Sequence, residues 1–146
     1  MNKLTKLSLI IFFTICVKSI ATSKENFFNQ ALELYNQEKY QDARFLFERN
    51  IVFNPNDANS YLYLAKIYKY EKDQRKEEYN LETTLLIEPN NEDAILMMMQ
   101  IALEKSNYEK VKNLSERFSK VCNKLCNENE KIQDSLKNIQ PENNES

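Results

Sequence analysis

The sequence predicts an all-α protein made of repeated antiparallel helix pairs. The stretch Asn54-Pro55-Asn56-Asp57 recurs 34 residues later as Glu88-Pro89-Asn90-Asn91, and 34 residues is the length of one helix–turn–helix repeat. Between these stretches, apolar residues recur at every third or fourth position, as on one face of a helix. The chain contains no Gly and is rich in Glu, Lys and Leu, a composition typical of helical proteins.

The N-terminus has the order of a secretory signal peptide. Lys3 and Lys6 precede an apolar run from Leu7 to Val17, and small residues follow at Ser19 and Ala21. We therefore expect residues 1–21 to be a signal peptide cleaved near Ala21, and the mature protein to be periplasmic or secreted. Loss of three lysines leaves 17 basic residues against 22 acidic ones, a net charge of −5. This charge argues against nucleic acid or an anionic membrane surface as partners.

Two alternatives for the N-terminus stay open. The apolar run could be an uncleaved membrane anchor, although it is shorter than the ~20 residues of a typical membrane-spanning helix. Cys16 could instead carry a lipid, but the bulky Ile15 stands where a small residue is expected. In either case the membrane would be reached only through this segment.

The first helix pair is predicted between Phe27 and Asn54. The polar residues 36–39 separate its two helices, and Pro55 ends the second because proline lacks a backbone donor. The apolar face of the pair consists of Phe27, Ala31, Leu34 and Tyr35, followed by Tyr40, Ala43, Phe47 and Ile51.

The second and third pairs repeat this order. In the second, residues 71–74 form the turn, and either Asn56 or Asp57 can cap the first helix. In the third, Asn91 is the expected cap and residues 104–107 form the turn. A last helix is predicted over 126–140, and the polar residues 141–146 are predicted to be disordered.

This pattern resembles the tetratricopeptide repeat (TPR), with units over 24–57, 58–91 and 92–125. Ala31 and Ala65 take the small position of the first helix, and Pro55 and Pro89 close the first two units. Five residues depart from the family pattern. Gln30 and Asn50 stand where the family prefers Leu and Ala, Glu77 and Met99 occupy small positions, and Asn123 replaces the terminal Pro. The resemblance implies a right-handed superhelical stack of helix pairs, with residues 126–140 as a capping helix.

The resemblance also implies a peptide-binding groove lined mainly by the first helix of each pair. Several of the implied groove residues are apolar, so we expect a peptide or helix held by apolar side chains, with Lys66 and Lys69 available for a carboxylate. The alternative is that these apolar residues pack within the short stack. The implied groove residues are Phe28, Leu32, Tyr35, Leu62, Lys66, Lys69, Tyr70, Leu96, Gln100 and Leu103.

Cys122 and Cys126 are the two thiols that remain after cleavage. An even pair in an oxidising compartment favours a structural disulfide between the third unit and the last helix. A thiol or metal carrier is the alternative, but the spacing is not the usual C-x-x-C and the chain has no His.

Composition also argues against catalysis. Without His or Gly, the chain lacks the commonest general base and the glycine-rich loops of nucleotide-binding folds. The sequence therefore predicts an exported, non-catalytic adaptor or assembly factor that binds a protein or peptide and needs no cofactor or metal. The runner-up is a structural subunit of an envelope complex, anchored at its N-terminus.

Overall fold

The computed structural model describes residues 26–139, and these form helices joined by short turns. The predicted signal peptide and the tail lie outside this range. The described chain divides after Pro55 into two compact units, and each unit is considered by itself. The first unit contains one helix pair, and the second contains two helix pairs and a last helix.

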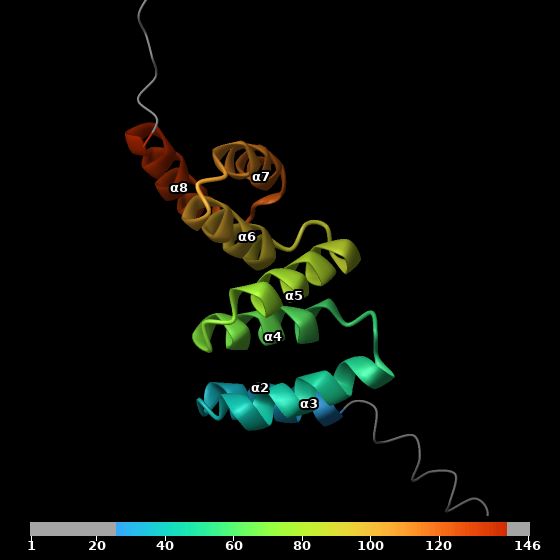
Figure 1. The fold of residues 1–146 in the computed structure, drawn as a ribbon. Coiled ribbons are helices and arrows are strands. Elements are labelled where there is room, and N and C mark those ends of the chain that lie inside the picture. The colour runs from blue at the N-terminus through green and yellow to red at the C-terminus, as the bar shows by residue number, and fades with distance from the viewer. Residues whose placement is uncertain (1–25, 140–146) are drawn as a thin grey trace, which may run out of the picture. The chain divides into compact units, whose positions relative to one another are not determined.

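The first unit pairs α2 (Asn26–Asn36) with α3 (Tyr40–Phe53) (Figure 1). Ala31, Ala43 and Phe47 are completely buried, as the helical periodicity predicted. Because the two alanines are small, the helices can approach closely. The ring of Phe27 stacks on that of Phe53, with 5.7 Å between the centroids.

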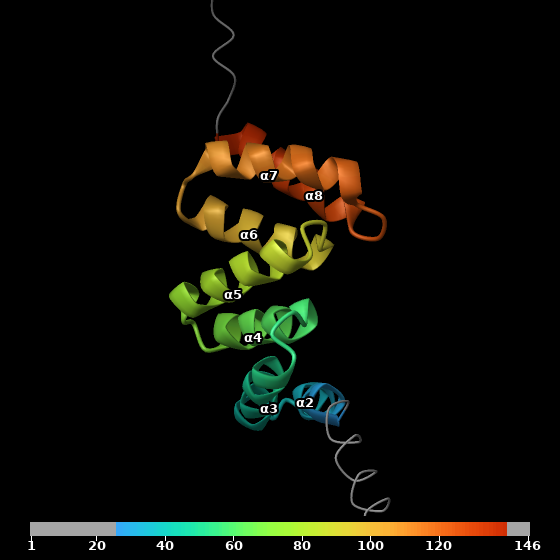
Figure 2. The same ribbon diagram turned by 90° about the vertical axis from the view of Figure 1, so that its right-hand side faces the viewer.

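The second unit stacks two further pairs and a last helix (Figures 1 and 2). The pairs are α4 (Ala58–Tyr70) with α5 (Gln74–Ile87), and α6 (Glu92–Glu104) with α7 (Tyr108–Val121). The last helix, α8 (Cys126–Ile139), packs on both α6 and α7.

The three turns within pairs share one geometry at the predicted period. Glu38, Lys72 and Ser106 all have φ near +60°, a left-handed conformation that usually falls to Gly. In each turn the next backbone N–H donates to the carbonyl five residues earlier, at 2.8–3.0 Å, which ends the preceding helix. The 34-residue repeat is thus a repeat of backbone geometry, built here without Gly.

Helix α6 lies at the centre of the second unit and is apolar over most of its circumference, while Asp93 and Gln100 form a polar stripe. One face, including Met98 and Ile101, packs with α4 and α5 around Ala65 and Leu81. A helix packed on two opposite faces needs apolar residues over most of its circumference.

The opposite face of α6 packs with α7 and α8. Met99 is completely buried there, in a cluster with Val111, Phe118 and Ile132. The large side chain at the small position of the family pattern therefore fills space between α6 and its later neighbours.

Asp57, one of the two predicted caps, occupies the N-cap position of α4 but makes no side-chain capping hydrogen bond. Its carboxylate accepts a hydrogen bond from the Ser60 hydroxyl at 2.7 Å. Asn91 does cap α6, since its side-chain oxygen accepts from the backbone N–H of Ala94 at 3.0 Å.

Candidate protein-binding surface

The first helices of the second unit's two pairs are joined by polar side chains, of which Lys66, Lys69 and Gln100 were predicted groove residues. Lys66 of α4 lies 2.7 Å from the Asp93 carboxylate of α6, and Lys69 donates to the Gln100 side-chain oxygen, also at 2.7 Å. Tyr70 is one position further along α4 and is 68% exposed. We call the surface formed by Lys66, Lys69, Tyr70, Asp93 and Gln100 the α4–α6 face.

The polar bonds of the α4–α6 face are accessible to solvent. Lys69 and Gln100 are exposed, and the side chains of Lys66 and Asp93 are 28% and 42% exposed. An ion pair at such a surface contributes only about 0–1 kcal/mol. A ligand could therefore exchange these bonds for its own at low cost.

The apolar groove residues of the second unit lie differently. Leu62 is 5% exposed and packs with Leu81 and Met98, and Leu96 is 8% exposed and shares a cluster with Ile132 of α8. Leu103 is half-buried against the same cluster. Packing within the stack was the alternative that the sequence left open, and the structure shows that packing for these three residues. They offer little surface to a ligand.

In the first unit, two predicted groove residues are engaged with their own helix pair. The ring of Phe28 meets Phe47 edge-on with 5.7 Å between centroids, and Tyr35 meets Tyr40 edge-on at 5.4 Å. Leu32 is half-buried. A binding role for these residues stays a prediction.

Glu78 links the two pairs of the second unit on another side. Its carboxylate forms ion pairs with Lys105, in the turn after α6, and with Lys110 of α7 at 3.4 Å. The hydrogen bond from Lys105 is the main reason that the pKa of Glu78 is lowered. This contact could not be predicted from the sequence, because the two lysines lie 27 and 32 residues from Glu78.

Glu92 is a second acid whose role the sequence did not reveal. Its carboxylate accepts hydrogen bonds from the backbone N–H groups of Asn123, Lys124 and Leu125, at 3.0–3.1 Å. These bonds, above all the one from Leu125, lower the pKa of Glu92. The first residue of α6 thus holds the α7–α8 loop, where the family pattern would place a proline.

The same loop carries the cysteine pair. The sulfur atoms of Cys122 and Cys126 lie at disulfide distance, and their Cα atoms are 5.4 Å apart. This places the pair where a bond would join the end of α7 to the start of α8.

Glu77 is a buried acidic residue at a position where the family pattern has a small side chain. It is 5% exposed in α5, and burial raises the pKa of its carboxyl group. The neighbouring acids Glu104 and Glu78 act in the same direction, while Lys69 opposes them.

Within residues 26–139, no helix combines the length and apolarity needed to cross a membrane. Over the same part of the chain, no three potential ligands among Cys, Asp and Glu gather closely enough to hold a metal ion.

Comparison with solved structures defines the fold. The TPR domain of Sgt2 from Aspergillus fumigatus matches with a TM-score of 0.68 and 11% sequence identity, covering 86% of each chain. A chain of the CopN–Scc3 complex matches with a TM-score of 0.63 and 15% identity, covering 76% of this chain and 67% of that one. No protein-family model and no curated protein matches the sequence. The protein has a TPR-like, all-helical fold.

Proposed function

We propose that this protein is a non-catalytic, exported module that binds a protein or peptide on the α4–α6 face. The observation that carries the proposal is the exposed row of polar side chains along the first helices of two successive pairs. The TPR-like fold supports the proposal, and one of the similar chains comes from a complex of two proteins, CopN and Scc3.

The burial of the predicted apolar groove residues changes which groups of a ligand we expect to contribute to binding. Because Leu62 and Leu96 are buried, apolar side chains of the ligand have little to contact on the α4–α6 face. Lys69, Gln100 and Tyr70 are exposed and offer a cation, an amide and a phenol ring. A ligand with a carboxylate and a hydrogen-bonding backbone fits this set better than an apolar helix does.

Co-purification from the native envelope tests the binding proposal. Lys69→Glu should reduce recovery of a bound protein, because it places a like charge opposite a ligand carboxylate. Lys120→Glu, at an exposed position of α7 outside the face, is the matched control and should leave recovery unchanged. Equal recovery with both variants would reject the α4–α6 face as the binding site.

Export is a separate part of the proposal and has a separate test. The mass of the protein recovered from the cell envelope should correspond to a chain that begins at Thr22. A full-length mass would favour the uncleaved anchor, and a mass increased by lipid on Cys16 would favour the lipoprotein.

We also propose that Cys122 and Cys126 form a structural disulfide. Thiol titration of the denatured mature protein should find no free thiol without reductant and two with it. Two reactive thiols in the exported protein, or a bound metal ion, would favour the carrier alternative instead.

A further inference from the structure

Helix α8 is placed as the first helix of a fourth pair. It begins at Cys126, which follows Glu92, the first residue of α6, by the repeat length of 34 residues. It packs on α6 and α7 as α6 packs on the pair before it. Each earlier first helix is covered by a return helix, whereas the described part of the chain ends with α8.

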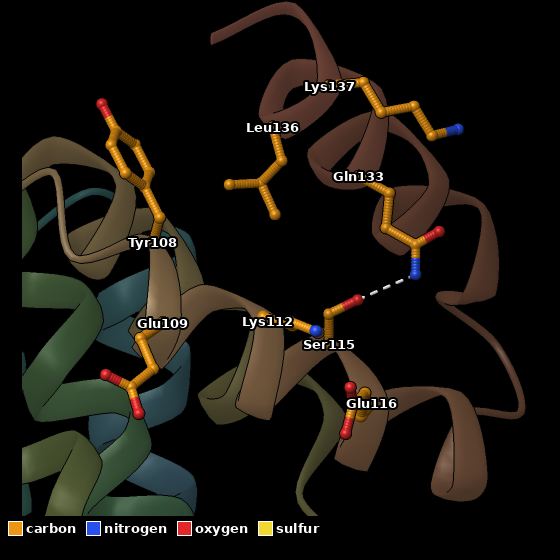
Figure 3. A pocket seen from close by; sticks show the side chains of 8 residues that line it. All are labelled: Tyr108, Glu109, Lys112, Ser115, Glu116, Gln133, Leu136 and Lys137. Atoms are coloured by element: carbon orange, nitrogen blue, oxygen red, sulfur yellow. Dashed lines mark hydrogen bonds between the residues drawn. The ribbon is translucent and has the colours of Figure 1, made fainter. Parts of the chain in front are cut away.

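An open groove lies between α7 and α8, with a volume of about 640 Å³ (Figure 3). On the α8 side it is lined by Gln133 and Leu136, which follow Met99 and Ala102 of α6 by one repeat length. Met99 and Ala102 belong to the cluster that α6 forms with its return helix. The groove therefore occupies the position at which a return helix would cover α8.

The polar side chains at the floor of the groove are hydrogen-bonded to one another. The Gln133 amide donates to the Ser115 hydroxyl at 2.9 Å, the bond drawn in Figure 3, and that hydroxyl donates to Asn129 at 2.7 Å. Both Ser115 and Asn129 are buried. The floor is thus fixed before any ligand arrives, which lowers the entropic cost of binding.

The charge in this groove differs from the charge at the equivalent contact one repeat earlier, between α5 and α7. At that contact, Glu78 of α5 meets Lys110, which lies in the first turn of the return helix α7. One repeat length after Glu78 stands Lys112, which lines the open groove and makes no ion pair with any residue in 26–139. Glu109, Glu116 and Lys137 also line the groove, so its charge is mixed. At the register position of Glu78, however, the charge is reversed, and an acid where α7 has Lys110 would meet Lys112. An acid in a first helical turn is also favoured by the helix dipole.

The chain's own following residues fit this position poorly. Continuing the repeat places Glu145 at the counterpart of Val111, which is completely buried in α7. It also places Asn144, and no acid, at the counterpart of Lys110. Burying the Glu145 carboxylate without a partner would be costly.

We propose that the α7–α8 groove binds a helix of a partner protein that has an acidic residue in its first turn, followed directly by a buried apolar residue. The apolar stripe continues three and seven residues later, as Leu114 and Phe118 follow Val111 in α7. This site is separate from the α4–α6 face, and neither depends on the other.

Two synthetic helices test the proposal. Both copy α7 (Tyr108–Val121); one keeps Lys at the position of Lys110, and the other carries Glu there. Fluorescence anisotropy would measure their binding to the full mature chain. The Glu peptide should bind about fivefold more tightly, the ratio expected for replacing a like-charge contact by an exposed ion pair. Lys112→Glu should reverse this order, whereas the control Lys120→Glu, outside the groove, should preserve it.

Several results would overturn the proposal. These are no binding of either peptide, equal binding of both, or an order that Lys112→Glu does not change. Undiminished binding to Leu136→Glu would place the peptide elsewhere. A tenfold gain in peptide affinity on removing residues 140–146 would assign the groove to the chain's own tail. Self-association that Leu136→Glu abolishes would assign it to a second copy.

Discussion

Replacing Ala65 by Leu tests the packing register of the second unit. Ala65 is completely buried in α4, in a cluster with Leu62, Leu81 and Met98. An isobutyl group has no free space at this contact, so the helices must move apart or the side chains must leave their preferred rotamers. Overpacking of this kind costs about 1–3 kcal/mol.

The expected loss is large enough to measure in a melt. For a domain of this size, each kcal/mol lowers the melting temperature by about 4–8 °C. Circular dichroism at the helix minimum would follow both thermal and urea unfolding of the Ala65→Leu variant. Both residues are good helix formers, so propensity contributes little to the difference.

The control is Tyr70→Leu, at the end of the same helix. Tyr70 is 68% exposed, and a substitution at such a position should change stability by no more than about 0.5 kcal/mol. Equal unfolding midpoints for Ala65→Leu and the wild type would show that Ala65 does not face the helix contact, and would refute the register.

Three further changes address the acids and the cysteine pair. Glu77→Gln should raise the urea midpoint of unfolding at pH 7, because burial disfavours the ionised carboxylate in the folded protein and so raises the Glu77 pKa. This gain in stability should vanish below about pH 4, where the carboxyl group is protonated in both the folded and the unfolded state. Glu92→Gln should speed amide exchange at residues 123–125, because it weakens the hydrogen bonds to their backbone N–H groups. In the wild type these bonds lower the Glu92 pKa, so the carboxylate stays ionised and the bonds stay intact above the ordinary Glu pKa near 4.3. Acid should release them as the pH falls through the lowered pKa. Unchanged exchange at neutral pH would contradict the role of Glu92. Changing Cys122 and Cys126 together to Ser should lower the free energy of unfolding by about 2 kcal/mol, the loop-closure estimate for so short a loop. Equal melting temperatures of this variant and the wild type would show that no disulfide had formed.

The helices could be predicted from local signals. Pro55 and Pro89 end helices because they remove a donor, and their spacing sets the period for the remaining turns. Ala31 and Ala65 revealed the close helix contacts because only a small residue fits there. Such features depend on a few neighbouring residues and are therefore visible in the sequence.

The candidate binding surface could be predicted only in part. Lys66 and Lys69 lie on an exposed face as the resemblance implied, whereas Leu62 and Leu96 are buried. A family pattern gives the face of a helix, but it does not tell how far the next pair covers that face. In a short stack with a capping helix, that coverage decides whether an apolar residue is exposed.

Contacts between distant residues could not be predicted from the sequence. Glu92 binds amides 31–33 residues away, and nothing local distinguishes it from an ordinary acid at a helix start. The 34-residue register relates Lys112 to Glu78 and so reveals the reversed charge, but the groove beside Lys112 depends on how α7 and α8 pack.

Site-specific photocrosslinking would test the central claim, that the α4–α6 face contacts a protein partner, most directly. A photoreactive amino acid would replace Tyr70 on that face, or Tyr79 on α5 as the control. The two tyrosines are 68% and 66% exposed, so the probes have equal access to solvent. We predict that a probe at Tyr70 and, in a separate variant, a probe at Gln100 capture the same protein in the native envelope, and that the probe at Tyr79 does not. Capture of that protein with equal yield from Tyr79, or from none of these positions, would contradict it.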